Sequence, residues 1–523
     1  MDFNVEAPRS NSSEACELTR EQVRGSSLLL GGRFLALGLN FAAQVYIVRE
    51  LSTNDYGALA YGLAVVAFLR LFATLGLNEG VPRFLPLYRE NREYGKLFGT
   101  VCLASGAVIL AAILMAFAAL GLASRCLVKE RLALSLLAIL LLLVPFEAVD
   151  GVFDGVFASL AGTRNIFFRK YVLGPGLKLG LVMLLIVSHS SVTFLAWGLV
   201  VTGALTVVIY GWLLWRLLYA QGLIQRFRFA GLSTPAREVL AFVIPGVSAV
   251  LASSAIPFIN IFVLGWLRTL TDVAFYRAAV PVSELNGLVM ASFSLLYIPS
   301  AACLATQANY VRLNKLYWDT SAWMSVLSFP IFAATLAFAQ PVTTLLYGGR
   351  YAQSAPVLAS LSLGSYVNAA LGFNLQTLKV LGRLRYIIVV SAISIVMNFA
   401  LAVLLVPRYG ATGAGLGALI TSIAYNLLMQ AGLRPWSELK MFDSHYLSIY
   451  LTIALSVGAL YLVQISNPIS IWPALFLTAC VSVLVLALSK TKLNVFETFP
   501  ELLRLPFMRL IARRVTIAPP DGL

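Results

Sequence analysis

The sequence predicts an all-α polytopic membrane protein of about 14 transmembrane helices, arranged as two six-helix lobes in a pseudo-two-fold repeat followed by an extra helix pair. Composition is the first reason: 59% of the 523 residues are hydrophobic and only 12% are charged. The mean hydropathy is +0.86, which is too high for a water-soluble globular protein. The second reason is that the apolar residues fall in runs long enough to cross a hydrocarbon layer of about 30 Å as helices.

The N-terminal part of the chain begins with a polar segment of mixed charge, residues 1–25. We expect it to remain as a cytoplasmic segment and not to act as a cleavable signal peptide, because the first apolar run already has full spanning length. The N-terminal six-helix lobe is predicted over residues 26–218. Its helices are expected at 26–48, 57–78, 98–122, 133–158, 171–190 and 194–217.

The C-terminal half repeats this pattern after a cytoplasmic linker over residues 219–236. A second six-helix lobe is predicted over residues 237–433. Its helices are expected at 239–266, 281–304, 319–339, 355–377, 386–406 and 411–432. An extra pair follows within residues 434–490, with helices at 447–466 and 469–489. The basic tail over 491–523 alternates apolar residues with arginines, as a helix lying on a membrane surface does.

The distribution of Lys and Arg predicts the orientation of the chain. The N-terminus, every second loop and the C-terminus together hold 27 of these residues, whereas the opposite loops hold 8. Since cytoplasmic loops of membrane proteins carry an excess of positive charge, both termini are expected in the cytoplasm, with the protein in the cytoplasmic (inner) cell membrane. The net charge of +15 therefore reports topology, and nucleic acid is not an expected partner.

Two pairs of residues indicate that the six-helix lobes are related. Asp55 and Asp272 each follow the first helix of their lobe. Pro82 and Pro299, at the ends of the second and eighth helices, are separated along the chain by the same offset as the two aspartates. A common offset at corresponding places in the helix order favours a parallel repeat, an arrangement that suits an alternating-access transporter.

Three basic residues fall inside predicted helices. Arg33, Arg70 and Lys178 lie in the first, second and fifth helices, all in the cytoplasmic half of the N-terminal lobe. A charged side chain at membrane depth costs on the order of 3 kcal/mol by insertion scales, so it usually meets a partner, water or headgroups. For Arg33, snorkelling towards the headgroups is one interpretation; the other is that it faces a watery cavity between the lobes.

The fourth helix carries Glu147, Asp150 and Asp154 at spacings of three and four residues, which places all three carboxylates on one helical face. They share a membrane layer with the three basic residues, so ion pairing that holds the helices together is one interpretation. The other is a hydrated cavity in which the cations bind an anionic headgroup, while the carboxylates balance charge or couple transport to a cation.

Neither a cofactor nor a metal is expected. The five cysteines are scattered along the chain, and only two histidines exist, His189 and His445, so no metal-ligand spacing is present. No predicted extramembrane segment exceeds about 35 residues, which leaves no room for a soluble nucleotide-binding domain. ATP-driven transport within this chain is therefore not expected.

Several sequence stretches resemble one known family. They are AAQVYIVRELSTNDYG at 42–57, GLNEGVPRFLPLYRE at 76–90, the segment at 242–279 and VPRYGATGAGLGALI at 406–420. These resemble the polysaccharide biosynthesis (O-antigen type) flippases of the multidrug, oligosaccharidyl-lipid and polysaccharide exporter superfamily. One departure is Asn260 and Ile261, where that family often has an acidic residue followed by a basic one.

The resemblance implies a flippase that moves a polyprenyl-pyrophosphate-linked oligosaccharide from the cytoplasmic to the outer leaflet by alternating access of two lobes. Its partners would be this substrate, membrane lipid and a glycan polymerase or glycosyltransferase complex. Three alternatives stay open from the residues: a Na⁺- or H⁺-coupled drug or metabolite exporter, a membrane glycan polymerase or glycosyltransferase, and a scaffold for a synthesis complex. The second is disfavoured by the short outer loops, and the third gives no reason for buried charges.

Overall fold

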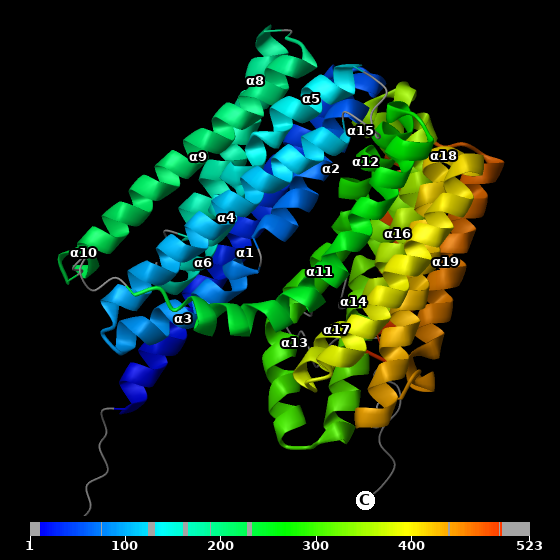
Figure 1. Cartoon of the computed structure of the whole chain (residues 1–523). Helices are drawn as coiled ribbons and strands as arrows, with labels where there is room; N and C mark the ends of the chain where they lie inside the picture. Colours follow the sequence, from blue (N-terminus) through cyan, green and yellow to red (C-terminus); the bar gives the residue numbers. More distant parts are fainter. Residues whose placement is uncertain are drawn as a thin grey trace, which may run out of the picture. The chain divides into compact units, whose positions relative to one another are not determined.

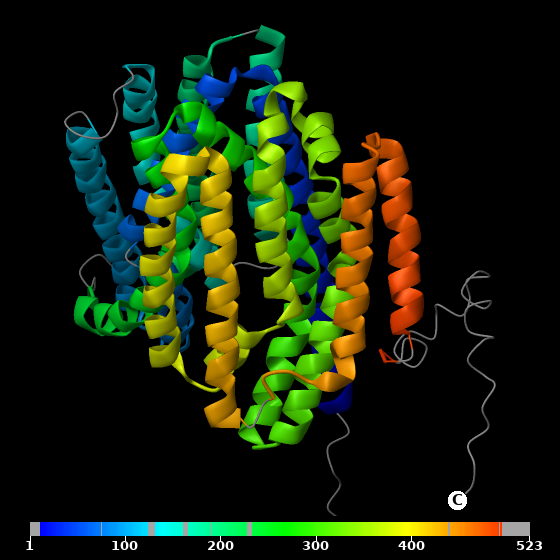
Figure 2. The ribbon, with the colours of Figure 1, turned by 90° about the vertical axis from the view of Figure 1, so that its right-hand side faces the viewer.

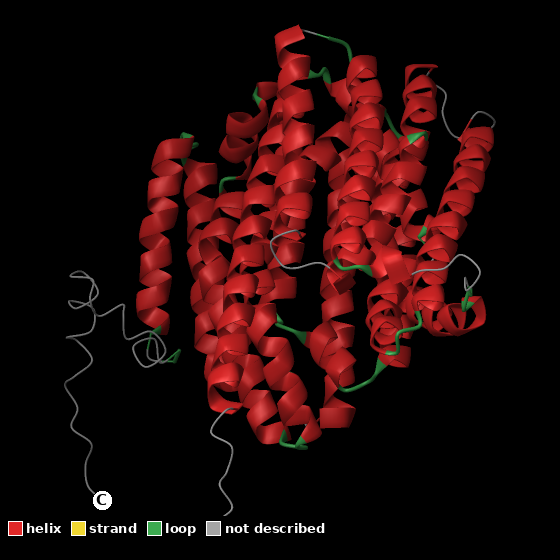
Figure 3. Cartoon of the chain, turned by 90° about the vertical axis from the view of Figure 1, so that its left-hand side faces the viewer, coloured by secondary structure: helices red, strands yellow, loops and turns green. Residues whose placement is uncertain are grey.

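The computed structural model describes residues 11–74, 76–123, 131–160, 166–188, 190–226, 233–437, 440–490 and 492–493. All regular secondary structure in these ranges is helical (Figures 1 and 3), which confirms the predicted all-α class. The chain forms two compact units, Met1–Ser254 and Ala255–Leu523, and each is described by itself below. Most of the predicted amphipathic tail, residues 494–523, and the N-terminal residues 1–10 lie outside the described ranges.

The described part of the first unit is built from consecutive helical elements, and its boundary falls inside the last of them. They are α1 (Asn11–Glu50), α2 (Thr53–Ala73), α3 (Leu77–Glu90), α4 (Tyr94–Leu122), α5 (Arg131–Leu141), α6 (Leu143–Leu160), the π-helix η2 (Phe168–Leu173), α8 (Gly174–Ser188), α9 (Val192–Ala220), α10 (Leu223–Arg226) and α11 (Ala236–Leu267). The helix α1 starts at Asn11, well before the predicted span at 26–48, because good helix formers such as Glu, Ala, Leu and Arg fill residues 14–24.

The second predicted span, 57–78, is divided in the structure. The helix α2 ends at Ala73, and α3 starts after Gly76, whose φ of 67° lies in the left-handed region that favours glycine. In contrast, α5 and α6 together form one span over Leu132–Leu160. The prediction of a single helix at 57–78 was therefore wrong at its C-terminal end, because the glycine turn starts a new helix there.

The second unit continues from α11 through a further series of helical elements. They are α12 (Leu270–Glu284), η4 (Leu285–Gly287), α13 (Leu288–Thr306), α14 (Tyr310–Ala337), α15 (Ala339–Tyr347), η5 (Gly349–Ser354), α16 (Ala355–Ala370), α17 (Asn374–Val380), α18 (Leu384–Ser437), η6 (Ser444–Tyr446), α19 (Leu447–Ser466) and α20 (Ile471–Ser489). The last two α-helices form the predicted extra helix pair and pack against α14; in Figure 2 they stand side by side in orange and red.

Ten helices in the described ranges are long and apolar enough to cross a membrane, or eleven when the pair Gly349–Ala370 and Asn374–Val380, bent by 42°, is taken as one span. The protein is therefore a multi-pass membrane protein. The predicted spans at 26–48 and 239–266 lie on α1 and α11, which are outside this count. In addition, α18 carries two predicted spans, joined at Gly410, where φ is 55° and ψ is −134°.

The local geometry at the start of α2 is repeated at the start of α12. Ser52 caps α2 by accepting a hydrogen bond from the Asp55 backbone N–H at 3.1 Å. Thr269, the residue in the corresponding position, caps α12 by accepting from the Asp272 backbone N–H at 3.4 Å. In both cases the cap hydroxyl also donates to the aspartate carboxylate, at 2.7 and 3.1 Å. The offset found in the sequence thus corresponds to a shared capping arrangement.

The segment that leads into α11 is fastened to the corner between α3 and α4. An ideal Cβ on Gly99 would lie 2.1 Å from the Ser233 carbonyl oxygen, so only glycine permits this approach. The Tyr88 hydroxyl donates to the Glu238 carboxylate at 3.1 Å. Burial, and then the Glu238 carboxylate, raise the pKa of Tyr88 to about 12, so the phenol keeps the proton it donates at neutral pH.

Candidate functional site

The three predicted carboxylates lie along one face of α6. Glu147, Asp150 and Asp154 are each about one third exposed, with side-chain exposures of 32%, 33% and 39%. The opposite face of the helix is packed, since Ala148, Val152 and Val156 are at most 1% exposed. The helical periodicity of the sequence therefore produces one acidic stripe on a helix whose other side is part of the apolar core.

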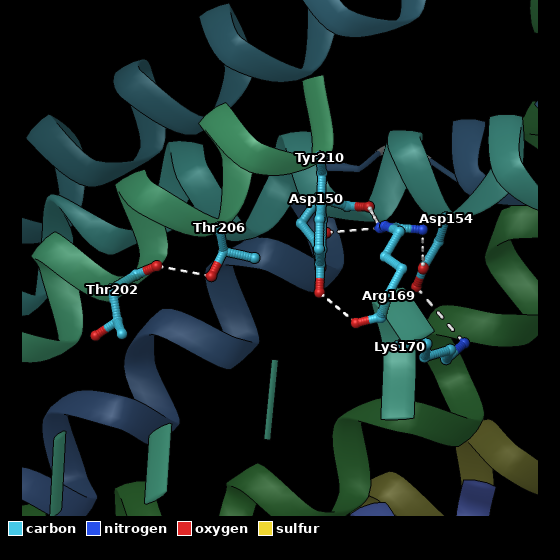
Figure 4. Close-up of polar contacts among 7 residues, drawn as sticks. All are labelled: Asp150, Asp154, Arg169, Lys170, Thr202, Thr206 and Tyr210. Carbon is cyan, nitrogen blue, oxygen red and sulfur yellow. Dashed lines mark hydrogen bonds and ion pairs between the residues drawn. The ribbon is translucent and has the colours of Figure 1, made fainter. Parts of the chain in front are cut away.

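Arg169 binds two of these carboxylates at once (Figure 4). One terminal nitrogen of its guanidinium lies 2.7 Å from Asp150 Oδ1, and the other lies 2.7 Å from Asp154 Oδ1. The planar fork of arginine suits such double contacts because its donors are fixed in direction. Lys170 adds a longer ion pair to Asp154 at 3.6 Å. The two aspartates are therefore balanced by two cations.

Arg169 is held in place by aromatic rings and by its own backbone. Its guanidinium lies 4.7 Å from the ring centre of Phe157 and 4.2 Å from that of Tyr210. The Tyr210 hydroxyl donates to the Arg169 carbonyl at 2.6 Å. This carbonyl belongs to η2, a π-helix, and such turns often occur at functional sites. The side chain is only 3% exposed, so it is fixed between α6 and α9.

Glu147 pairs with a different cation from the one that binds Asp150 and Asp154. The Arg70 guanidinium, in the last turn of α2, donates to Glu147 Oε2 at 3.4 Å. Arg70 is 49% exposed, and its 3.4 Å contact is longer than the about 2.7–2.9 Å of a strong charge-assisted hydrogen bond. This contact can therefore be exchanged for another anion at small cost, unlike the short contacts of Arg169.

A cavity of ≈ 180 Å³ lies between α6, α8 and α9. Its charged lining residues are Glu147, Asp150 and Lys178. Thr202 and Thr206 of α9 add hydroxyl groups, and Thr206 donates to the Thr202 carbonyl at 2.7 Å (Figure 4). The remaining lining residues are glycines and apolar side chains. Lys178 therefore shares this small, mostly apolar cavity with two of the predicted carboxylates.

Arg33 lies apart from this cluster. Its side chain is exposed on α1, and no ion pair or hydrogen bond joins it to another residue of the described ranges. The preceding residue fixes where α1 passes, because an ideal Cβ on Gly32 would lie 2.6 Å from the Tyr171 ring and 2.7 Å from the Phe167 ring. Of the six predicted residues, the structure thus brings together five and leaves Arg33 exposed next to η2.

Sequence reasoning missed Arg169 and Lys170. The fifth helix was expected to start at residue 171, which placed both residues in a cytoplasmic loop, whereas η2 starts at Phe168. A signal was present: the helix predicted at 133–158 carries three carboxylates, while the two nearest predicted cations, Arg70 and Lys178, cannot balance all of them. A charge count along the membrane layer would have pointed to the basic pair just before the fifth helix.

The arrangement can bind charged or hydroxylated groups but shows no metal-ligand set. In the part of the chain that the structure describes, no group of three or more His, Cys, Asp and Glu side chains could hold a metal ion. Ion pairing accounts for Asp150 and Asp154. Glu147 and Lys178 line the cavity, whereas Arg70 does not line it but is 49% exposed where it contacts Glu147.

The fold is that of an all-helical multi-pass membrane protein, and its first unit carries a cluster of charged side chains on α6 and η2. The family model "Polysaccharide biosynthesis protein" matches residues 22–302, more than half of the chain. The chain therefore belongs to the polysaccharide biosynthesis protein family, in agreement with the resemblance found in its motifs. No curated protein matches the sequence significantly.

Solved structures show the same fold at low sequence identity. The chain is similar to the lipid II flippase MurJ in its inward closed conformation, with a TM-score of 0.67 and 16% sequence identity. The alignment covers 92% of this chain and 100% of the MurJ chain. An inward-facing multidrug resistance MATE transporter of the MOP superfamily covers 82% of this chain and 95% of its own, with a TM-score of 0.59 and 16% identity. A MOP superfamily transporter from Pyrococcus furiosus has a TM-score of 0.52 and 15% identity, and the alignment covers 84% of this chain and 96% of that transporter.

Proposed function

We propose that the protein is a flippase that moves a polyprenyl-pyrophosphate-linked oligosaccharide from the cytoplasmic to the outer leaflet by alternating access. Membership of the polysaccharide biosynthesis family and the fold shared with a lipid II flippase support this proposal. The proposed role is transport and not catalysis, and it needs no cofactor. The lipid-linked substrate and membrane lipid are the partners, together with a glycan polymerase or glycosyltransferase complex.

One observation carries the substrate class: cations remain accessible in the membrane-spanning part of the first unit. Arg70 holds Glu147 only by a 3.4 Å contact and is half exposed, Arg33 is exposed, and Lys178 lines the cavity. In this proposal these three residues bind the pyrophosphate, whose oxygens accept the charge-assisted hydrogen bonds that arginine and lysine donate. Glu147 is the group that the substrate displaces from Arg70.

The proposal also specifies the orientation of the chain in the membrane and its division into lobes. Both termini lie in the cytoplasm, as the Lys and Arg distribution predicts. The membrane in this proposal is the cytoplasmic (inner) cell membrane. Residues 26–218 and 237–433 act as the two lobes, the linker at 219–236 joins them, and 434–490 forms the appended pair. Cysteine labelling of the loops from each side of the membrane tests the orientation.

The test is glycan export in cells that depend on this protein. Arg70→Ala and Arg33→Ala should each block export while the protein remains folded and inserted. Arg216→Ala is a matched control in the same unit, since its guanidinium only approaches the Trp212 ring at 5.7 Å, and it should export normally. Normal export by both Arg70→Ala and Arg33→Ala would remove the proposed binding role.

A second candidate is a Na⁺- or H⁺-coupled drug or metabolite exporter. The observation that favours it is the pair Glu147 and Asp150, two carboxylates on one small cavity, because carboxylates are the usual coupling groups of such pumps. Expression in a drug-sensitive host separates the two functions. Acquired resistance that disappears in Glu147→Gln would favour the exporter, whereas a glycan defect without any change in drug tolerance would favour the flippase.

A further inference from the structure

Arg169 is the most strongly enclosed charge in the cluster. Among the Arg, Lys, Asp and Glu side chains that the structure describes, it alone is buried, with an exposure of 3%. It does not line the cavity, whereas its partner Asp150 does. Arg169 therefore acts on the cavity only through the aspartates that it binds.

The charge balance of the cluster depends on this residue. Four cations, Arg70, Arg169, Lys170 and Lys178, face three carboxylates, which leaves one excess positive charge. Without Arg169 the count becomes three against three, and the uncompensated Asp150 borders the cavity. An anion entering that cavity would then meet a carboxylate whose charge is no longer neutralised, at a depth where screening is weak.

The position of the Arg169 guanidinium allows it to neutralise both Asp150 and Asp154. Each terminal nitrogen of the guanidinium serves a different aspartate at 2.7 Å, as Figure 4 shows. The Phe157 and Tyr210 rings lie against the guanidinium, and the same terminal nitrogen that binds Asp150 also lies 3.3 Å from its backbone carbonyl. A lysine could donate to both oxygens but lacks the flat fork and the stacking surface.

We propose that Arg169 is a positioning residue that neutralises Asp150 and Asp154, and that it thereby gives the cavity its preference for an anionic, phosphate-bearing headgroup over a cation. This inference rests on the proposed flippase function, and it assigns the selectivity of that site to a residue that does not touch the substrate. The preference for an anion is lost when Arg169 no longer neutralises the two aspartates.

The experiment measures binding of inorganic pyrophosphate to the purified full-length protein by calorimetry. Arg169→Gln should weaken binding roughly ten- to thirty-fold, the effect of one lost neighbouring charge at an intermediate dielectric. Adding Asp150→Asn and Asp154→Asn to Arg169→Gln should restore the affinity at least to that of the wild type, because three cations then face Glu147 alone and no carboxylate is left without its partner.

The rescue separates this inference from a purely structural role. If the ion pairs only hold the helices together, the triple variant lacks them as well and should bind as weakly as Arg169→Gln, which would overturn the proposal. Should Arg169→Gln fail to fold, the variant with Asp150→Asn and Asp154→Asn but an intact Arg169 replaces it. That variant should bind pyrophosphate roughly ten-fold more tightly than the wild type, and unchanged binding would also overturn the proposal.

Pyrophosphate binding by the wild-type protein distinguishes a failure of the flippase proposal from a failure of the role proposed for Arg169. A wild-type protein that binds no pyrophosphate contradicts the flippase proposal and this inference together. A wild-type protein that binds pyrophosphate, with Arg169→Gln folded and binding equally well, contradicts only the role of Arg169. Arg216→Ala serves as the control for a lost positive charge outside the cluster and should bind as the wild type does.

Discussion

Two irregular helical segments, one in each unit, are held by opposite kinds of interaction. In the first unit the π-helix η2 is held by charge, through the ion pairs of Arg169 with Asp150 and Asp154. In the second unit the break between α16 and α17 is held by neutral groups. The Tyr317 hydroxyl bonds the Leu371 carbonyl, the Tyr450 hydroxyl donates to the Ala370 carbonyl at 2.9 Å, and Asn374 donates to Asn426 at 3.1 Å.

The difference shows where the protein tolerates charge in its membrane-spanning part. A break in a membrane helix frees carbonyl groups that must find donors, and tyrosine and asparagine satisfy them without burying an ion. Buried ion pairs carry a desolvation penalty of several kcal/mol for each ion, so they are weak devices for stability alone. Their use beside η2, where Asp150 also borders a cavity with Glu147 and Lys178, is consistent with a role in ligand binding.

The largest expected effect concerns the neutral break. Gly372 has a φ of 74°, and an ideal Cβ on it would lie 2.0 Å from Ser321 Oγ. Gly372→Ala should lower the free energy of unfolding by about 3–4 kcal/mol, from left-handed strain together with overpacking. Gly382 is a matched control, since its φ is 71° but no atom lies within 4 Å of its ideal Cβ.

Gly382→Ala should therefore cost only the conformational part, about 1–2 kcal/mol. Thermal unfolding of the purified variants, followed by intrinsic fluorescence or by thiol accessibility, measures both. Equal losses in the two variants would show that the crowding at Ser321 relaxes freely, and Ser321 would then not restrict the backbone at the break.

The next effect in size concerns the hydroxyl of Tyr317. It donates to the Leu371 carbonyl and lies 2.5 Å from the Gln430 side-chain amide, whose orientation can be turned so that its nitrogen donates to the hydroxyl. Tyr317→Phe leaves both partners unpaired in a fully buried place and should cost about 2–3 kcal/mol. Tyr450→Phe removes one bond and should cost about 1 kcal/mol.

Varying the salt concentration tests whether the break in the second unit is held by neutral groups, in contrast to the ion pairs beside η2. The losses caused by Tyr317→Phe and Tyr450→Phe should not depend on ionic strength, because neutral hydrogen bonds are not screened. Unfolding midpoints measured at low and high salt check this expectation. A salt-dependent loss in Tyr317→Phe would mean that a charged group takes part in the break of the second unit.

The sequence predicted the helical class and most spans, because long apolar runs have few alternatives in a membrane. It did not predict the break after Ala370 or the one after Thr74. The first depends on partners from distant helices, such as Ser321 at Gly372, and the second on the left-handed turn at Gly76. Hydropathy contains no information on such contacts.

The site was predictable in part for the same reason. The spacing of Glu147, Asp150 and Asp154 fixes one helical face, and depth along each helix brought Arg70 and Lys178 to the same layer. Arg169 could not be placed from hydropathy, since a basic residue just before an apolar run is usually a loop residue. Its burial follows from the π-turn and from the Phe157 and Tyr210 rings.

A smaller effect tests the repeated caps. Asp55 and Asp272 receive the same bonds from their cap residues, but Asp272 Oδ1 also accepts from the Ala411 backbone N–H at 3.2 Å, beside the turn at Gly410. Asp272→Ala should therefore cost about 1–2 kcal/mol more than Asp55→Ala, the value of one partly buried hydrogen bond to a charged acceptor. Thermal unfolding of the two variants provides the comparison, and equal losses would contradict the extra contact.

The smallest expected effect on stability is that of Arg70→Ala. Its pair with Glu147 is long, at 3.4 Å, and both side chains are substantially exposed, so the loss should stay below about 1 kcal/mol. Lys96→Ala is the matched control, because Lys96 and Glu93 form a pair at 3.0 Å with similar exposure, and it should lose equally little. The two variants should differ only in glycan export, which Arg70→Ala abolishes and Lys96→Ala leaves intact. A loss above about 2 kcal/mol in Arg70→Ala would instead identify Arg70 as a residue that stabilises the fold, and the export defect would then follow from misfolding.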